Sequence, residues 1–283
     1  MNYRHAFHAG SFADVVKHAV LARILVHLKS KPAPFRVIDT HAGAGRYDLT
    51  GPEASRTGEW RDGIARLRAA PVEPDVAMLL APYLDVIAKF NRGEQLVTYP
   101  GSSEIVRAHL RPRDRLIACE LEPNAVRALA HDLAGDERAK AIALDGWTAL
   151  TAYVPPKERR GLVLVDPSFE QSDEYARLAD RFAAAHRKWP TGIYLLWYPI
   201  KDRRESEAFA RGLKRRAIAK VLRAELTIAE PRDGDRLTGS GLVIVNPPWM
   251  LDRELAAMLP ALAAILSGDR TGGTRIDRLT GEK

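Results

Sequence analysis

Cysteine is almost absent from this sequence of 283 residues, whose single thiol, Cys119, lies within an apolar run. One thiol cannot form an internal disulfide, and it cannot supply the thiolate cluster of a structural zinc site. The histidines at positions 5, 8, 18, 27 and 41 also lack the spacing of zinc ligands. We therefore expect no metal site, and a protein that works in the reducing environment of the cytoplasm.

Long hydrophobic runs are missing as well. No segment approaches the roughly 20 apolar residues that cross a bilayer, and residues 1–5 are not followed by the apolar stretch of a secretory signal. The charges are unbalanced, with 43 lysine and arginine residues against 36 acidic residues and a net charge of +7. We expect no membrane contact, and the positive charge favours a polyanionic partner such as nucleic acid.

Apolar segments of strand length alternate with segments of helical periodicity, which predicts an α/β fold with a mostly parallel, seven-stranded sheet. The length fits a single domain over residues 1–283. Ser11 predicts the start of an amphipathic helix over residues 11–30, and the polar, glycine-rich residues 268–283 are expected to be frayed. The predicted strands are Arg36–Asp39, Leu116–Glu122, Ala141–Leu144, Gly161–Val165, Gly192–Pro199, Ala224–Ala229 and Gly241–Val245.

Residues 51–95 contain helical patterns and no evident strand. In a doubly wound fold, the acid that ends the second strand follows the glycine turn after the first strand by about twenty residues. Here the glycines of that turn are Gly43 and Gly45, and the acid is Glu120. The simplest account is that residues 51–95 form a helical subdomain inserted after the first strand.

The turn over Thr40–Tyr47 lacks the third glycine of the dinucleotide fingerprint and the Lys-Ser/Thr pair of a phosphate-binding loop. It therefore favours a ligand without phosphates that lies against the turn. Acidic residues end or follow the next two predicted strands. Glu120 is placed to accept ribose hydroxyls, and Asp145, directly before Gly146, can cap a helix or accept a hydrogen bond from an adenine amine.

The fourth predicted strand, Gly161–Val165, is a short, unbroken apolar run that fits a strand buried on both faces of a parallel sheet. It delivers Asp166-Pro167-Ser168-Phe169 at its carboxyl end, where ligands bind in open α/β sheets. An acid, a proline and an aromatic residue suggest a pocket for a flat, hydrogen-bonding substrate. An ordinary Asp-Pro turn is the other interpretation.

These features together resemble the class I S-adenosylmethionine-dependent methyltransferases, whose fold is Rossmann-like. Asp166–Phe169 resembles the Asp-Pro-Pro-Tyr/Phe motif of methyltransferases that act on the adenine amine. A closer resemblance, to the RlmJ family, covers nearly the whole chain. Its members methylate the exocyclic N6 amine of one adenine in bacterial 23S ribosomal RNA. The segments that carry this resemblance are Tyr3–Gly10, Asp14, Lys17-His18, Phe35, Asp39–Tyr47, Tyr99–Ser102 and Trp197–Pro199.

The resemblance implies S-adenosylmethionine as cofactor and 23S ribosomal RNA, protein-free or partly assembled, as partner; we expect a monomer. It assigns Asp166 and the Pro167 carbonyl to the target amine, and Phe169 or Tyr3 to stacking on the base. For His18, the residues alone favour a hydrogen-bonded core histidine, whereas the resemblance assigns it to the methyl donor. The full donor set that it implies is His18, His41, Gly43, Ser102, Glu120, Asp145 and Gly146.

Three features leave alternatives open. Ser168 stands where the motif usually has a second proline, so a non-catalytic RNA-binding relative is an alternative, as is a DNA adenine or protein methyltransferase with the same donor site. Asn246-Pro247-Pro248-Trp249 is closer in letters to the motif, but it follows the last predicted strand, so we expect a structural turn with Trp249 packed. The basic helix over residues 201–217 is expected to be a solvated face, with phosphate contact as the alternative.

Overall fold

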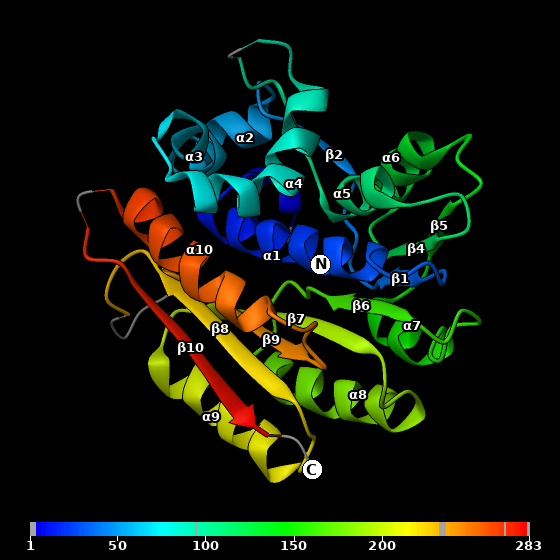
Figure 1. Cartoon of the computed structure of the whole chain (residues 1–283). Coiled ribbons are helices and arrows are strands. Elements are labelled where there is room, and N and C mark those ends of the chain that lie inside the picture. Colours follow the sequence, from blue (N-terminus) through cyan, green and yellow to red (C-terminus); the bar gives the residue numbers. More distant parts are fainter. Residues whose placement is uncertain (1–3, 94, 232–235, 269, 282–283) are drawn as a thin grey trace.

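The computed structural model describes residues 4–93, 95–231, 236–268 and 270–281, and its central sheet has eight strands (Figure 1). Their order across the sheet is β10-β8-β9-β7-β6-β1-β4-β5. The α/β class is confirmed, with one strand more than the seven predicted. The strands are β1 (Arg36–Asp39), β4 (Arg115–Glu120), β5 (Ala139–Ala143), β6 (Gly161–Val165), β7 (Ile193–Ile200), β8 (Val221–Thr227), β9 (Gly239–Val245) and β10 (Gly273–Thr280).

The sheet is parallel from β5 to β7, and β9, β8 and β10 extend it with antiparallel pairings. Two helical layers cover its faces, and each encloses its own apolar core (Figure 1). All the parallel strands therefore end at one edge of the sheet, where ligands bind in this class of fold. One layer holds α1 (Phe12–Lys29), α5 (Ser102–His109), α6 (Pro123–Leu133) and α10 (Leu251–Ser267), and the other holds α7 (Gly146–Ala152), α8 (Glu174–Lys188) and α9 (Arg203–Arg215).

Helix α1 is buried on nearly all sides, so the prediction of an amphipathic helix is wrong. It starts as expected, because the Ser11 side chain accepts a hydrogen bond from the Asp14 amide. It then contacts β9 on the sheet and α4 (Pro74–Phe90), α5 and α10 around it. A helix enclosed in this way is apolar all round instead of along one stripe. Four of its polar residues, Asp14, Lys17, His18 and Arg23, are buried too.

The carboxyl-terminal segment forms an ordered strand, β10, over Gly273–Thr280, so the prediction that residues 268–283 are frayed is wrong for these residues. β10 pairs antiparallel with β8 and covers its free edge. Its alternate side chains serve two purposes: Leu279 is buried in the core, and Asp277 forms an ion pair with the buried Arg223 of β8. The pairing explains the extra strand, because an open edge would leave backbone amides of β8 without partners.

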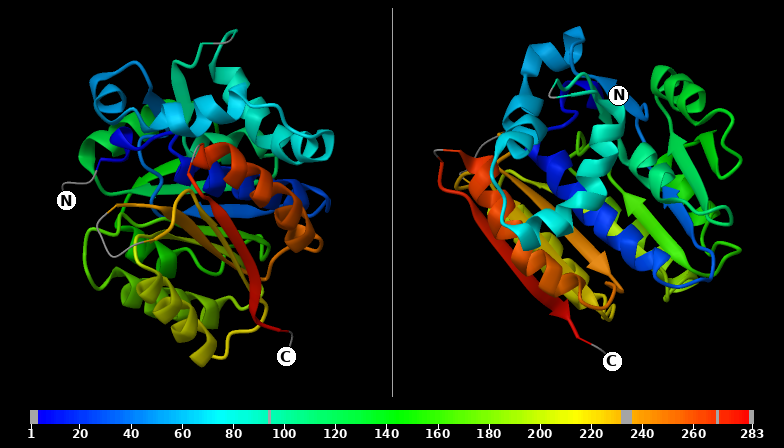
Figure 2. Two further views of the ribbon diagram at one scale, coloured as in Figure 1. Left: turned by 90° about the vertical axis from the view of Figure 1, so that its left-hand side faces the viewer. Right: turned by 45° about the horizontal axis from the view of Figure 1, so that its top comes forward.

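The helices between residues 51 and 95 stack on α1 and α10 instead of on the sheet (Figure 2). They are α2 (Pro52–Thr57), a segment kinked at Gly63 over Arg61–Ala65, α3 (Arg66–Ala69) and α4. A separate antiparallel pair, β2 (Arg46–Asp48) and β3 (Thr98–Pro100), brackets them. The chain therefore leaves after the glycine turn and returns at the start of α5, which accounts for the late position of Glu120 in the sequence. Their status as a subdomain of their own stays a prediction.

The longest helix, α1, has 18 residues and carries the charged side chains of Asp14, Lys17 and Arg23. Within the described ranges, no helix is long and apolar enough to cross a membrane. The same ranges hold no group of three histidine, cysteine or acidic side chains placed to bind a metal ion.

We expect Asp277→Ala to lower the free energy of unfolding by about 1.5–3 kcal/mol, because Arg223 would lose a bidentate partner while staying buried. Asp277 accepts from Arg223 Nε at 2.8 Å and from Nη2 at 3.0 Å. Asp252→Ala is the matched control, since it removes an exposed ion pair with Arg278 of the same strand and should cost at most about 1 kcal/mol. Denaturant unfolding of both variants tests this. Equal losses of stability in the two variants would show that the ion pair between Asp277 and buried Arg223 contributes no more than an exposed one.

Candidate active site

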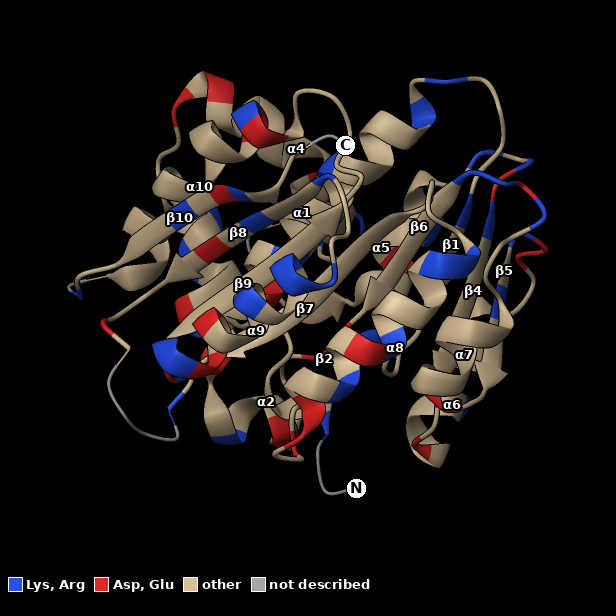
Figure 3. Ribbon diagram, turned by 90° about the horizontal axis from the view of Figure 1, so that it is seen from below, with Lys and Arg blue, Asp and Glu red and all other residues tan. Residues whose placement is uncertain are grey.

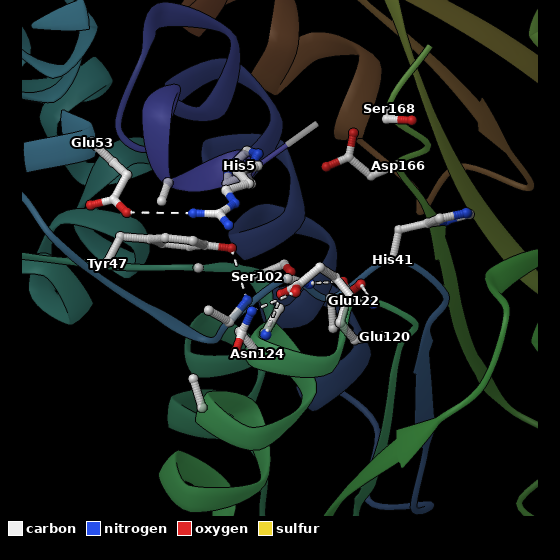
Figure 4. Close-up of a pocket in the computed structure, with 18 of the residues that line it drawn as sticks. His5, His41, Tyr47, Glu53, Ser102, Glu120, Glu122, Asn124, Asp166 and Ser168 are labelled. Carbon is white, nitrogen blue, oxygen red and sulfur yellow. Dashed lines mark hydrogen bonds and ion pairs between the residues drawn. The ribbon is translucent and has the colours of Figure 1, made fainter. Parts of the chain in front are cut away.

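Two adjoining cavities lie at the carboxyl ends of β1, β4 and β6, with volumes of about 470 and 260 Å³. Figure 4 shows the larger one. His41, Glu120 and Ser168 line both cavities and separate them. A shared wall of this kind suits an extended ligand that runs from one cavity into the other. Of the residues predicted for the site, the larger cavity brings together His18, His41, Gly43, Ser102, Glu120 and Asp166, and the smaller one His41, Glu120, Asp145, Gly146 and Pro167.

Glu120 is held rigidly at the end of β4 by backbone amides. Its Oε2 accepts from the Gly43 amide at 2.8 Å, and its Oε1 accepts from the amides of Leu121 and Glu122 at 2.7 and 2.8 Å. Gly43 has φ +63°, and a Cβ there would lie 2.0 Å from the Tyr47 hydroxyl oxygen. The glycine turn and the acid therefore fix each other. The carboxylate keeps lone pairs for a ligand, because two oxygens offer about four acceptor positions.

The smaller cavity is built by close packing at the start of α7. A Cβ on Gly146 would lie 2.3 Å from the Thr40 carbonyl oxygen and 2.5 Å from His41 Nε2. Asp145 caps the helix, accepting from the Thr148 amide at 2.9 Å, which confirms the capping interpretation and leaves its other oxygen for a ligand. The His41 ring meets Trp147 edge-on at 5.2 Å. His41 and Trp147 therefore supply aromatic walls to the smaller cavity.

Two buried polar groups support the larger cavity: His18 lines it, and Asp39 bonds to the lining residue Ser102. Asp39 is fully buried at the end of β1, and burial raises the pKa of its carboxyl to about 7, although the Ser102 hydroxyl donates to Oδ2 at 2.6 Å. Burial also lowers the pKa of His18 to about 3, so its ring is neutral. His18 Nδ1 shares a hydrogen bond of 2.7 Å with the Tyr99 hydroxyl. His18 is thus a hydrogen-bonded core histidine that also lines the cavity.

Asp166 projects into the larger cavity and forms an ion pair with Lys17 of α1, a residue that the sequence analysis did not assign to the site. Lys17 Nζ also lies 2.9 Å from Asp14 Oδ1, and its side chain is only 5% exposed. Burial opposes the charge, but Asp14 and Asp166 together raise the pKa of Lys17, so it stays protonated. The sequence did contain a signal for this role: Asp14 and Lys17 are spaced i, i+3 as an ion pair within a helix that is otherwise largely apolar.

The amino-terminal segment reaches the same network through His5. His5 Nε2 lies 2.9 Å from Asp14 Oδ2, and the His5 ring lies 5.1 Å from the Tyr47 ring. The Gly10 amide also donates to Asp14 Oδ2 at 3.0 Å. His5, Asp14, Lys17 and Asp166 thus form a continuous chain of contacts from the amino terminus to the end of β6.

Comparison with known proteins agrees with this geometry. A family model described as ribosomal RNA large subunit methyltransferase D, RlmJ, matches residues 32–280. Proteins of Escherichia coli K12 and Haemophilus influenzae, both named ribosomal RNA large subunit methyltransferase J, are 39% and 37% identical to this chain over 100% of both sequences. The chain belongs to the RlmJ family. A crystal structure of a Legionella pneumophila protein shares 33% identity and a TM-score of 0.86, covering 96% of this chain and 98% of that one.

Ser168 and Phe169, the last two residues of the segment Asp166–Phe169, have different surroundings. Ser168 lines both cavities, whereas Phe169, at φ +52°, packs edge-on against Tyr175 and Trp197 with ring distances of 4.9 and 5.7 Å. Tyr3 lies outside the described residues. The roles of these residues, and of the donor set, stay predictions.

The second motif of similar letters, Asn246–Trp249, lies at the opposite edge of the sheet, because β9 runs antiparallel to β7. This agrees with its exclusion from the site. The expectation that Trp249 is packed is wrong, since its side chain is 84% exposed.

We expect Gly146→Ala to weaken binding of S-adenosylmethionine at least roughly tenfold, because its Cβ would push the Thr40 and His41 wall out of place by more than a small relaxation can absorb. Gly281→Ala is the control, since no atom lies within 4 Å of its added Cβ. Isothermal titration with the donor measures both. Unchanged affinity in Gly146→Ala would place the donor elsewhere.

We expect the contribution of Asp39 to the free energy of unfolding to fall as pH rises from about 4 to 7, opposite in sign to the contribution of neutral His18. The unfolded chain loses the Asp39 proton near pH 3.8, whereas the folded chain keeps it to about pH 7. Within that window Asp39 binds more protons in the folded state, so through this group raising the pH favours unfolding. Asp39→Asn still accepts from Ser102 but cannot ionise, so denaturant titrations should show its stability relative to the wild-type protein rising with pH across this window. For the exposed control Asp180→Asn, this difference from the wild-type protein should not change with pH.

Proposed function

We propose that this protein transfers a methyl group from S-adenosylmethionine to the exocyclic N6 amine of an adenine in 23S ribosomal RNA. The observation that carries the proposal is the Asp166 carboxylate, which projects into the larger cavity and is held there by Lys17. The names of the curated relatives support ribosomal RNA of the large subunit as the substrate. The net charge of +7 agrees with a polyanionic substrate.

The side chains around the cavities suit a cationic donor with ribose and adenine groups. The carboxylates of Glu120 and Asp145 are fixed by backbone amides and offer acceptors for hydroxyl and amine groups. Ser102, Gly43 and neutral His18 line the larger cavity, where the amino acid part would lie. When bound, S-adenosylmethionine supplies an electrophilic methyl group on a sulfonium. Asp145 and Gly146 would hold its adenine end in the smaller cavity, and Ser102, Gly43 and His18 would hold its amino acid end in the larger one, beside Asp166.

Asp166 and Pro167 activate the acceptor. An adenine amine is a weak nucleophile because its lone pair is delocalised into the ring. Hydrogen bonds from its two N–H groups to the Asp166 carboxylate and the Pro167 carbonyl localise that pair and aim it at the methyl group. Lys17 occupies Asp166 Oδ2, so Oδ1 accepts from the amine, and the carboxylate receives the proton that nitrogen loses as the new N–C bond forms.

The target base must leave any helical stack to reach this pocket. Phe169 or Tyr3 would stack on it, which contributes roughly 1–3 kcal/mol per base. Ser168 restores a backbone N–H that a second proline would remove, and the Pro167 carbonyl remains in place. Protein-free or partly assembled ribosomal RNA as the substrate, the monomeric state, the cytoplasmic location and the helical subdomain over residues 51–95 belong to the same proposal.

We expect Asp166→Ala to lower the rate of methyl transfer by about 100- to 10,000-fold while leaving donor affinity nearly unchanged, because the contact is with the acceptor. Asp145→Ala is the reciprocal variant: it should weaken donor binding and retain transfer at saturating donor. Single-turnover assays and donor titrations separate the two effects. Loss of donor binding in Asp166→Ala would place this carboxylate in the donor half of the site.

The proposed function itself is tested with a donor labelled in its methyl group. The wild-type protein should label protein-free 23S ribosomal RNA, and digestion to nucleosides should return the label as N6-methyladenosine. Labelling of duplex DNA or of protein in place of RNA would identify a different acceptor. If the protein binds the donor but transfers the methyl group to none of these acceptors, it is a non-catalytic relative and the proposal is wrong.

A further inference from the structure

Trp249 is the most exposed large apolar side chain of the described chain, at 84%. It follows β9, whose last residue, Val245, pairs with Tyr194 at the start of β7. Trp249 therefore lies at the edge where the parallel strands begin, whereas Asp166 follows the end of β6. With about 3.3 Å per residue, the five residues of β6 put the two edges roughly 17 Å apart. Nothing in the methyl transfer site uses this tryptophan.

The turn that carries Trp249 is held in one conformation. Asn246 has φ +52° and donates from Nδ2 to the carbonyls of Pro190 and Gly192 at 2.8 and 2.7 Å. Met250 has φ +72°, and two prolines stand between them in the chain. Two residues with side chains in the left-handed region cost free energy, and such conformations persist where the surroundings enforce them. The turn therefore fixes the backbone position from which the Trp249 side chain extends into solvent.

Basic side chains lie along the same edge of the sheet as this turn. Figure 3 shows blue segments gathered where β1, β4, β5 and β6 begin. Trp249 and the exposed basic residues of this edge are called the amino-end surface below. The basic members are Lys31, Arg113, Lys157, Arg159, Lys220 and Arg253.

Among the described residues, half-buried Arg160 beneath this surface donates to backbone carbonyls and forms no ion pair with a carboxylate, whereas Arg111 has a carboxylate partner. Arg160 donates to the carbonyls of Leu28 and Ala33 at 2.6 and 2.9 Å. Arg111 pairs with Asp114, yet its Nη1 also donates to the Lys31 carbonyl at 2.7 Å. Burial, and after it the charge of Arg111, lowers the pKa of Arg160, as expected where cations crowd together. Asp114 and Glu158 offset only part of the local positive charge.

We propose that the amino-end surface is a second RNA-binding site, which takes a single-stranded segment of the ribosomal RNA away from the target adenine. The inference rests on the proposed function, since it concerns the same substrate. Fixed aromatic rings among Lys and Arg are the recurring platform for single strands, because every base offers a face for stacking and every phosphate a charge. A duplex would keep its bases stacked and leave Trp249 unused. The surface thus holds a large RNA at a distance from the catalytic cavity.

The direct test uses a fluorescein-labelled uridine dodecamer, which offers no adenine to the catalytic cavity. Fluorescence anisotropy should show binding by the wild-type protein. Trp249→Ala should weaken it by roughly 5- to 100-fold, the loss of one stacked base, and Trp249→Phe should restore most of the affinity. Met78→Ala is the matched control, because Met78 is exposed on α4 and lies outside the amino-end surface. Wild-type affinity in Trp249→Ala, or no binding by the wild-type protein, overturns the inference.

The charges are tested through the salt dependence of the same binding. The double variant Arg159→Glu/Arg253→Glu should bind the dodecamer more weakly, with a shallower slope against salt concentration, because fewer phosphates are neutralised. Arg181→Glu, exposed midway along α8, should keep the wild-type slope. An equal slope in all three proteins would show that the basic residues of the amino-end surface do not contact phosphates.

Two further readouts separate the inference from its rivals. If Trp249→Ala binds the dodecamer weakly but the wild-type protein methylates no RNA, the proposed function fails and the surface stands. If RNA is methylated but Trp249→Ala binds like the wild-type protein, only the inference fails. Sedimentation of the wild-type protein and of Trp249→Ala tests whether a second copy of this chain, instead of RNA, binds at Trp249. A wild-type dimer that dissociates in Trp249→Ala would show that Trp249 meets a second copy of this chain, and would overturn the inference.

Discussion

The ion pair between Lys17 and Asp166 joins the first helix of the chain to the end of the central strand. It exists because α1 is enclosed by the sheet, α4, α5 and α10, so that the Lys17 ammonium is cut off from water. A buried cation is tolerated only with partners, and Asp14 and Asp166 supply them. The burial of one helix therefore fixes the direction in which the reactive carboxylate points.

The same network connects the site to the segment that precedes α1. Asp14 receives hydrogen bonds from His5 and the Gly10 amide while it balances Lys17. A change in the amino-terminal segment would thus affect Asp166 through three successive contacts, His5 with Asp14, Asp14 with Lys17, and Lys17 with Asp166. The residues proposed to bind the donor are held differently. Backbone amides fix Glu120, and Gly146 packs closely against Thr40 and His41, so this part of the site depends on the turns after β1 and β5 instead of on α1.

The two edges of the sheet carry different chemistry. The carboxyl edge gathers Asp39, Glu120 and Asp166 around the two cavities, where a cationic donor and an amine are to meet. The opposite edge gathers arginines, lysines and Trp249. Because strand direction is shared by β1, β4, β5, β6 and β7, every loop that enters a strand lies at one edge and every loop that leaves lies at the other. A large RNA can thereby be held at one edge and modified at the other.

The local pattern was enough for much of this protein. Apolar runs predicted the parallel strands. Because parallel strands end at one edge of the sheet, the acidic residues that follow them were expected at that edge. Glu120, Asp145 and Asp166 do line the two adjoining cavities there. The late Glu120 likewise pointed to an insertion. Packing between distant segments decided the rest. The burial of α1, the Lys17 contact, the pairing of β10 with β8 and the exposure of Trp249 depend on which surfaces meet in space, and periodicity within one segment carries no information about its neighbours.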